Sequence, residues 1–290
     1  KSPINKTILF EQLLINTKTS HKDGTGIYQK DSGIFKTKEA ANNIPNLAIT
    51  LNSFIKNTKP IIAHVRLCTN KNLISDDRAH PFETEKLVFA HNGTLKSKIC
   101  EEDRYKDMID SQVFLSELNS NYNDKDFLNA IKTTMKDFTG TFAFLIYSKL
   151  EDRYFVVRGD TKKIYSSNII INNEPGIVIN TDDNDLRMNL SILSDLYLLN
   201  GINFSFTELD IIPANSINEI DVLKNKVNKI DDIKENVEPV ISTVVTSNRQ
   251  NGGFKYFNSS TNSKLITKMS MIINFLSSTE ISTSDFDNII

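Results

Sequence analysis

The sequence contains no tryptophan, only four histidines and only two cysteines, Cys68 and Cys100, in 290 residues. Two cysteines cannot build a disulfide framework, and their wide separation excludes a paired Cys-x-x-Cys motif. Both are expected to stay reduced, which predicts a cytoplasmic protein.

Net charge and long apolar runs are also scarce. The formal net charge is −2, so no overall basic field attracts nucleic acid or an anionic membrane surface. No apolar run approaches the roughly 20 residues of a membrane-spanning helix. We therefore expect neither a nucleic-acid partner nor a membrane partner. Hydrophobic residues make up 39% of the chain, which indicates one large globular domain with a real core.

The spacing of apolar residues predicts the secondary structure as far as residue 220. Helical spacing occurs over 7–15, 48–55, 110–118, 127–138 and 186–199. Alternating or short apolar runs predict strands over 26–29, 33–36, 61–67, 87–91, 141–147, 154–158, 164–171, 176–180, 204–209 and 215–220. Helices first, then strands, then a helix with closing strands indicate an α+β layered fold.

Some elements lead to finer expectations. The strand 87–91 is the natural neighbour of the strand 61–67, and the four strands between 141 and 180 are expected to form an antiparallel meander. Asp110 is the expected N-cap of its helix. Gly140 is the expected C-cap of the helix before it.

The character of the chain changes after residue 222. Residues 223–262 are rich in Lys, Asn, Ser and Thr and predict a low-complexity linker. Apolar residues return at helical spacing over 263–277, which predicts a tail helix. The expected organisation is a domain at 1–222, a linker at 223–262 and a C-terminal segment at 263–290. A protein partner would bind through 223–290.

Residues 61–93 hold an unusual concentration of polar groups. Three of the four histidines, His64, His80 and His91, lie in this stretch. The period of a strand directs His64 and Arg66 to the same face of 61–67, towards a cleft. The histidines can equally hold core backbone by hydrogen bonds. Arg66 can equally pair with a surface carboxylate.

Two other interpretations of this region remain open. Asn92-Gly93 is a common hairpin signal. Asp110 can also be explained as a helix cap with no role in binding. A zinc site formed by the histidines with Asp76 or Asp77 matches no helical His-x-x-x-His spacing. We therefore expect no metal and no other cofactor.

Short segments along the chain form a recognisable series. They are His-Lys-Asp-Gly-Thr-Gly-Ile at 21–27, Ala-His-Val-Arg-Leu-Cys-Thr at 63–69, His-Pro-Phe at 80–82, Ala-His-Asn-Gly-Thr-Leu at 90–95, Ile-Asp-Ser-Gln at 109–112, Gly-Thr-Phe-Ala-Phe at 140–144, Val-Arg-Gly-Asp at 157–160 and Ile-Pro-Ala-Asn-Ser at 212–216. Over roughly residues 5–220 the series resembles class II glutamine amidotransferases, most closely the small standalone members. Gln112 and Ala214 depart from that family, where an acidic residue and a glycine are usual.

The resemblance implies a four-layer αββα sandwich of the N-terminal-nucleophile hydrolase type, with a C-terminal extension, and it implies site residues. Arg66 would bind the substrate α-carboxylate and Asp110 the α-ammonium group. The Asn92 side chain and the Gly93 N–H would form the oxyanion hole, where losing a donor costs about 2.7–4 kcal/mol. The remaining implied residues are Thr69 in substrate binding and, as pocket support, Asp23, Gly24, His64, His80 and His91.

The nucleophile of this family is an N-terminal cysteine whose own α-amine acts as the base. The resemblance places it on a strand before Lys1, and neither Cys68 nor Cys100 has a free α-amine to replace it. The implied function is an amidohydrolase that releases ammonia from glutamine or a γ-glutamyl compound. The alternative is a catalytically inactive protein of the same fold, used as a binding or structural component, for example in a phage virion.

Overall fold

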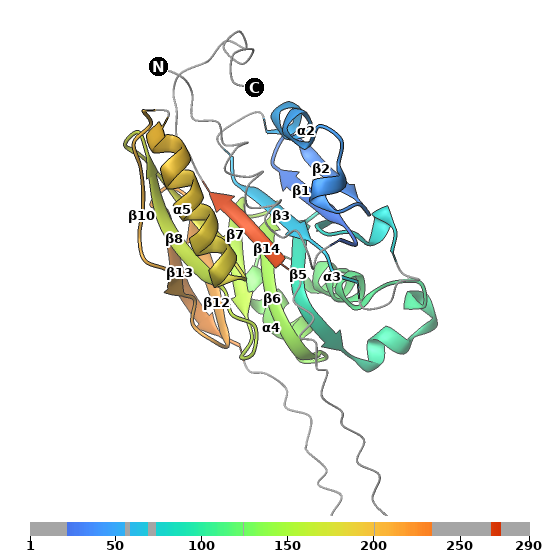
Figure 1. Ribbon diagram of the computed structural model, residues 1–290. Helices are drawn as coiled ribbons and strands as arrows, with labels where there is room; N and C mark the ends of the chain where they lie inside the picture. The colour runs from blue at the N-terminus through green and yellow to red at the C-terminus, as the bar shows by residue number, and fades with distance from the viewer. Residues whose placement is uncertain are drawn as a thin grey trace, which may run out of the picture.

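The computed structural model describes residues 22–55, 59–68, 74–123, 125–199, 201–233 and 268–273, and these residues form four layers (Figure 1). Two β-sheets face each other. On the outer face of one sheet lie the helices α2 (Leu47–Phe54) and α5 (Asp183–Leu199), and on the outer face of the other lie α3 (Asp110–Asn121) and α4 (Phe127–Met135). This is the αββα sandwich that the family resemblance implies, and it agrees with the α+β layered fold predicted from periodicity.

The first sheet, sheet A, has eight strands among the described residues, and every pairing in it is antiparallel. Its order is β10-β8-β9-β14-β3-β1-β2, and β11 pairs with β8. The strands are β1 (Thr25–Gln29), β2 (Gly33–Thr37), β3 (Ile61–Val65), β8 (Tyr165–Ile171), β9 (Glu174–Asn180), β10 (Phe204–Phe206), β11 (Asp210–Ile211) and β14 (Lys268–Ile273).

The second sheet, sheet B, has the order β13-β12-β7-β6-β5-β4. Its strands are β4 (Phe82–Glu83), β5 (Leu87–Lys96), β6 (Thr139–Ser148), β7 (Arg153–Arg158), β12 (Ser216–Asp221) and β13 (Lys226–Asp232). Short 3₁₀ turns cover Ala41–Asn43, Asp76–Arg78, Lys98–Glu101 and Asp103–Tyr105.

Three hydrophobic clusters separate the four layers. One lies between sheet A and its helices, and a second lies between sheet B and its helices. The third fills the interface between the two sheets and includes Ile62, Val88, Leu145, Val156 and Ile179. Because the other sheet covers one face and helices cover the other, the central strands β1, β3 and β7 are almost continuously buried.

Periodicity placed most elements of the domain within a few residues. The hairpin β1–β2, the helices α2 and α5, and the strands β8 and β12 match their predicted ranges closely. The predicted helix at 110–118 continues to Asn121. The predicted helix at 7–15 lies outside the described residues. Within the part of the chain that the structure describes, none of the helices has the length and apolar character needed to cross a membrane.

Two predicted strand pairings are wrong. β3 pairs with β1 and β14, whereas β5 belongs to sheet B and pairs with β4 and β6. The strands between 141 and 180 form no single meander, because β6 and β7 lie in sheet B while β8 and β9 lie in sheet A. Alternation in a sequence reports which face of a strand is buried, and it does not identify the neighbouring strand.

Both predicted helix caps are also displaced. The N-cap of α3 is Ile109, and Asp110 is the first helical residue. The Gln112 side chain reaches back to accept a hydrogen bond from the Ile109 N–H at 3.1 Å, so an amide serves here as the usual acidic residue would. α4 ends at Met135, and Gly140 lies in β6 with a φ of +120°.

The C-terminal region differs most from expectation. Residues 226–232, assigned to the linker, form β13 and pair with β12, so sheet B extends past the predicted boundary at 222. Residues 268–273, assigned to a tail helix, form β14 inside sheet A. Pairing with a strand on each side outweighs the helical spacing of the apolar residues.

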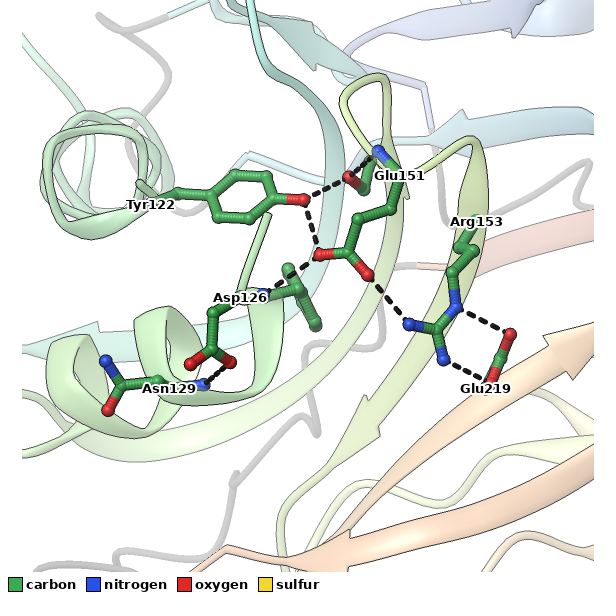
Figure 2. Close-up of polar contacts among 8 residues, drawn as sticks. Tyr122, Asp126, Asn129, Glu151, Arg153 and Glu219 are labelled. Atoms are coloured by element: carbon green, nitrogen blue, oxygen red, sulfur yellow. Dashed lines mark hydrogen bonds and ion pairs between the residues drawn. The ribbon is translucent and has the colours of Figure 1, made fainter. Parts of the chain in front are cut away.

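A partly buried polar network joins the helix layer to sheet B (Figure 2). The Glu151 carboxylate accepts from the Tyr122 hydroxyl at 2.6 Å and from the Phe127 N–H at 3.0 Å. Arg153 donates to Glu151 at 2.7 Å and also pairs with Glu219. The start of α4, the β6–β7 turn and β12 are therefore fixed together by charge-assisted hydrogen bonds.

Replacing Gly26 with alanine is expected to destabilise the fold by more than about 3 kcal/mol. A Cβ at this position in β1 would lie 2.0 Å from the carbonyl oxygen of His80, so the backbone would have to move. Gly33→Ala is the matched control. A Cβ there meets no atom within 4 Å, and its φ of +82° costs an L-residue only about 1–2 kcal/mol. Urea unfolding measures both losses, and equal losses would contradict the expectation.

Candidate functional site

Arg66 lies just beyond the end of β3 and is held there by the segment that precedes β1. The Asp23 N–H donates to the Arg66 carbonyl at 3.0 Å, and the Arg66 N–H donates to the Gly24 carbonyl at 2.8 Å. The β1–β3 ladder thus continues past the two strands. The Asp23 carboxylate also accepts from the Cys68 N–H at 2.9 Å. Gly24 and Asp23 therefore fix the backbone from Arg66 to Cys68.

Gly24 lets this turn approach Arg66 closely. Its φ is +151°, and a Cβ there would lie 3.3 Å from the Thr37 carbonyl oxygen and 3.6 Å from the Cβ of Arg66. A side chain at this position would be strained and crowded. Asp23 and Arg66 are both buried. Predicted residue Thr69 lies outside the described residues.

Asn92 and Gly93 lie in the middle of β5 and form no hairpin. They face Ala143 and Phe142 of β6 in register. The buried Asn92 side chain donates from Nδ2 to the Thr181 Oγ1 at 3.1 Å. Since Thr181 directly follows β9, this bond joins sheet B to the end of a sheet A strand. At Gly93 a Cβ would lie 1.9 Å from the Thr141 carbonyl oxygen, so only glycine fits.

Thr181 was not predicted from the sequence. The sequence feature that could have identified it is the polar run Asn180-Thr181-Asp182, which directly follows the apolar residues 177–179. The same pattern, an apolar run that ends in polar residues, singled out Arg66. β3 and β9 run in the same direction on the two sides of β14, so both signals point to the same end of sheet A.

His64 and His91 connect the two sheets at this place. His64 Nε2 lies 3.1 Å from the carbonyl oxygen of His91. His91 Nε2 lies 3.4 Å from the Thr141 carbonyl oxygen, so it is the donor, and its Nδ1 accepts from the Ser111 hydroxyl at 2.8 Å. Arg66 is two residues from His64, and Asn92 adjoins His91. The His64–His91 bond therefore brings both predicted binding groups to one region.

His80 packs between other rings and is fully enclosed. Its ring centroid lies 4.3 Å from that of His64 and 4.4 Å from that of Phe82. Among the described residues, neither ring nitrogen has a hydrogen-bond partner. Burial first, and then the nearby His64, His91, Arg66 and Lys36, hold the pKa of His80 well below its usual value of 6.5.

The pKa of His91 is also lowered, chiefly by burial and against the opposing effect of Asp110. His80 and His91 are therefore neutral at pH 7. Neutral rings suit packing and hydrogen bonding rather than anion binding. Among the described residues, no group of three or more His, Cys, Asp or Glu side chains could hold a metal ion.

Asp110 connects the start of α3 to β5. Its Oδ2 accepts from the Leu95 N–H at 2.7 Å, and its Oδ1 accepts from the Ser111 N–H at 2.9 Å. Leu95 is two residues beyond Gly93, so the carboxylate lies beside the strand that holds the predicted oxyanion donors. The Ser111 hydroxyl also lies 3.4 Å from Oδ1. A carboxylate oxygen has two lone pairs, so Oδ2 can accept from a ligand while it keeps its bond to Leu95.

The two cysteines lie in different surroundings. Cys68 is buried next to Asp23, and Cys100 is partly buried. Cys100 lines a surface cavity of about 470 Å³ together with Lys96, Ser97, Lys98, Glu101, Asp137 and Thr139. No predicted site residue lines this cavity. This cavity therefore does not coincide with the region around Arg66 and Asn92, and we place the candidate site by the polar contacts.

The fold is shared with solved amidotransferase structures. The glutamine phosphoribosylpyrophosphate (PRPP) amidotransferase from B. subtilis, complexed with ADP and GMP, matches with a TM-score of 0.52 and 16% identity, over 80% of this chain and 47% of that one. A structure described as the allosteric regulatory enzyme of purine biosynthesis matches with a TM-score of 0.52 and 15% identity, at the same coverage. These likenesses show the fold alone.

No family model matches the sequence. Among curated proteins, 7-cyano-7-deazaguanine synthase 2 of Sulfurisphaera tokodaii is 24% identical over 234 residues, which are 76% of this chain and 47% of that protein. The chain thus spans about half the length of the proteins it matches.

Proposed function

We propose that this chain is a class II glutamine amidotransferase-like amidohydrolase, which releases ammonia from glutamine or a γ-glutamyl compound. The observation that supports this most is the link through His64 and His91, which brings Arg66 from sheet A and Asn92 from sheet B to one region. Hydrolysis of an amide substrate with a charged α-carboxylate needs a guanidinium group to bind the carboxylate and hydrogen-bond donors for the oxyanion.

The roles follow from the chemistry of each group. The Arg66 guanidinium binds the α-carboxylate, and Asp110 accepts from the α-ammonium group. As the amide carbon becomes tetrahedral, its oxygen takes hydrogen bonds from Asn92 Nδ2 and the Gly93 N–H. Asp23 and Gly24 keep Arg66 in place, and Thr69 adds a further substrate contact. The three histidines support the pocket as neutral rings.

The nucleophile in this proposal is a cysteine at the N-terminus of the mature protein, on a strand ahead of Lys1. Its thiolate attacks the amide carbon, its α-amine takes the thiol proton and returns it to the leaving ammonia, and water then hydrolyses the thioester. This arrangement requires a free α-amine next to the thiol. Cys68 and Cys100 are both internal residues and cannot provide it.

The synthase relative favours a particular use of the ammonia. A cyano group contains a nitrogen atom that a synthase of that kind must obtain from a donor. A domain that releases ammonia fits that requirement. We propose that the ammonia passes to a nitrogen-incorporating partner, either in the same polypeptide or as a separate protein.

The test uses the natural protein with its mature N-terminus verified by intact mass. We expect ammonia release from glutamine, together with one covalent adduct of a diazoketone glutamine analogue on the N-terminal cysteine. Arg66→Ala should raise KM, because it removes the carboxylate contact, while Arg187→Ala, at an exposed arginine paired with Glu208, serves as the control. A protein that neither releases ammonia nor takes up the analogue would be the binding or structural component instead.

Replacing Cys100 with serine is expected to leave the rate of amide hydrolysis within about twofold of the original. Burial and the nearby Asp110 raise the pKa of the Cys100 thiol, so it stays protonated near neutral pH and is a poor nucleophile. Ammonia release from glutamine measures the effect. A loss of more than about tenfold would assign Cys100 a part in the reaction.

A further inference from the structure

β14 occupies a central position in sheet A, next to the candidate site. β14 fills the space between β3 and β9, which we call the β3–β9 slot. Figure 1 shows β14 beside β3. It is antiparallel to both neighbours, and residues 233–267 separate it from the end of β13. Among the described residues, removing β14 would divide sheet A into two parts, β10-β8-β9 and β3-β1-β2, each with an unpaired edge.

The direction of β14 brings its first residue to the candidate site. Lys268 faces Val65, the residue before Arg66, and the strand then runs away from that end to place Ile272 opposite Ile61. On its other edge, Ser270 faces Asn180, the residue before Thr181. A strand in the β3–β9 slot therefore begins beside both Arg66 and the Thr181 partner of Asn92.

The other edges of the two neighbours are already paired. β3 is bonded to β1 on its far side, and that ladder continues through Asp23 and Gly24 to Arg66. β9 is bonded to β8, with Asn180 facing Tyr165. Within the described part of the chain, the β3–β9 slot is thus the strand position that adjoins both Arg66 and Thr181.

We propose that β14 is an autoinhibitory strand, which occupies the β3–β9 slot in place of the strand that presents the nucleophile. This inference rests on the proposed function, which requires a nucleophile at the first residue of a strand beside Arg66 and Asn92. Neighbouring strands lie about 4.8 Å apart, so the space between two strands that each bond to the occupant holds one strand only. β14 runs in the direction that such a strand needs, and the two exclude each other.

Two full-length variants of the natural protein test the exchange. Met271 faces Ile62 of β3 and Ile179 of β9. A proline there removes a backbone N–H from the middle of β14 and weakens its insertion. Met271→Pro is expected to raise the rate of ammonia release from glutamine by about tenfold or more, and Asn251→Pro, outside the strand, is the control.

The second variant holds β14 in place and does not depend on how Met271→Pro folds. Ala63 and Ser270 face each other in register, so A63C/S270C allows a disulfide between β3 and β14. Mild oxidation is expected to lower the rate at least about tenfold, and dithiothreitol to restore it. The single variants A63C and S270C, oxidised and reduced in the same way, correct for oxidation of other thiols.

The outcomes separate the two ideas. A cross-linked protein that hydrolyses glutamine as fast as its reduced form would overturn the autoinhibitory role and leave the proposed function intact. So would a folded Met271→Pro protein that is slower than the original, because β14 would then be needed for the active sheet. If no variant releases ammonia or takes up the diazoketone in either redox state, the proposed function itself is wrong.

Discussion

Replacing Asn92 with alanine is expected to lower kcat for glutamine hydrolysis by about 10²–10³-fold and to change KM little. The Asn92 side chain is buried and donates to Thr181 at 3.1 Å, so it is held in place before the substrate binds. A pre-oriented donor stabilises the oxyanion that develops in the transition state more than it stabilises the neutral ground-state amide. Steady-state kinetics on the mature protein separates kcat from KM.

Thr181→Val is the matched comparison for Asn92→Ala. Thr181→Val removes the hydroxyl that holds the Asn92 amide, while valine keeps the shape of the threonine side chain. The Asn92 Nδ2 donor itself remains, so a smaller loss of kcat is expected. Both changes remove the hydrogen bond between Asn92 and Thr181, which is worth about 1 kcal/mol of stability, and urea unfolding checks this loss independently. An Asn92→Ala protein with normal kcat would remove Asn92 from the oxyanion hole. Equal losses in both variants would mean that Asn92 acts only through its orientation.

The spacing of apolar residues predicted most helices and strands correctly, because in a layered fold each element must bury one face against the next layer. The apolar spacing of 48–55 marks α2, since one face of that helix must cover sheet A. Tight turns such as Asp31-Ser32 mark the β1–β2 hairpin in the same local way. These features depend on residues a few positions apart, and a sequence reports them directly.

The partner of a strand depends on residues far away in the sequence. β3 and β5 were expected to pair, and instead they face each other across the interface between the sheets, with His64 bonded to the His91 carbonyl. The expectation of proximity was right for the histidines and wrong for the strands. β14 shows the stronger case, because residues 263–277 fit a helical template, yet the β3–β9 slot holds residues 268–273 as a strand.

The candidate site was partly accessible from the sequence. Arg66, Asn92 and Asp110 stood out because motifs and strand alternation mark polar groups at the ends and edges of apolar runs. Thr181 was missed, because its contact with Asn92 joins residues that are far apart in the chain and belong to different sheets. The role of Asp23 as a backbone acceptor for Cys68 likewise depends on the path of the chain after β3.

The histidine cluster is expected to make the protein acid-sensitive below pH 6.5. The pKa values of His80 and His91 are lowered in the folded protein, so below about pH 6.5 the unfolded chain binds more protons. The free energy of unfolding then falls by about 1.4 kcal/mol per pH unit for each histidine, or about 2.7 kcal/mol for the two. The loss begins as the pH falls through the unfolded value and continues down to the folded pKa.

His80→Phe tests which ring is responsible. The cations and rings that face His80 are Lys36 from β2, His64 and Arg66 from β3 and the residues that follow it, and His91 from β5, and no carboxylate among the contributors offsets them. A phenyl ring keeps the stacking on His64 and Phe82 and cannot be protonated. We expect nearly unchanged stability at pH 7.5 and a pH slope reduced by about one proton.

His91→Phe is the contrasting variant, because it removes the bonds to Ser111 and Thr141 and leaves their polar atoms without the ring. It should lose about 1–3 kcal/mol at pH 7.5. Its pH slope should also fall by about one proton, because His91 no longer titrates. Urea unfolding at pH 5.5, 6.5 and 7.5 distinguishes the two patterns. If His80→Phe kept the full slope, the buried His80 would not be the group that loses its proton on folding. Acid sensitivity would then have to come from His91, whose bonds already require it neutral.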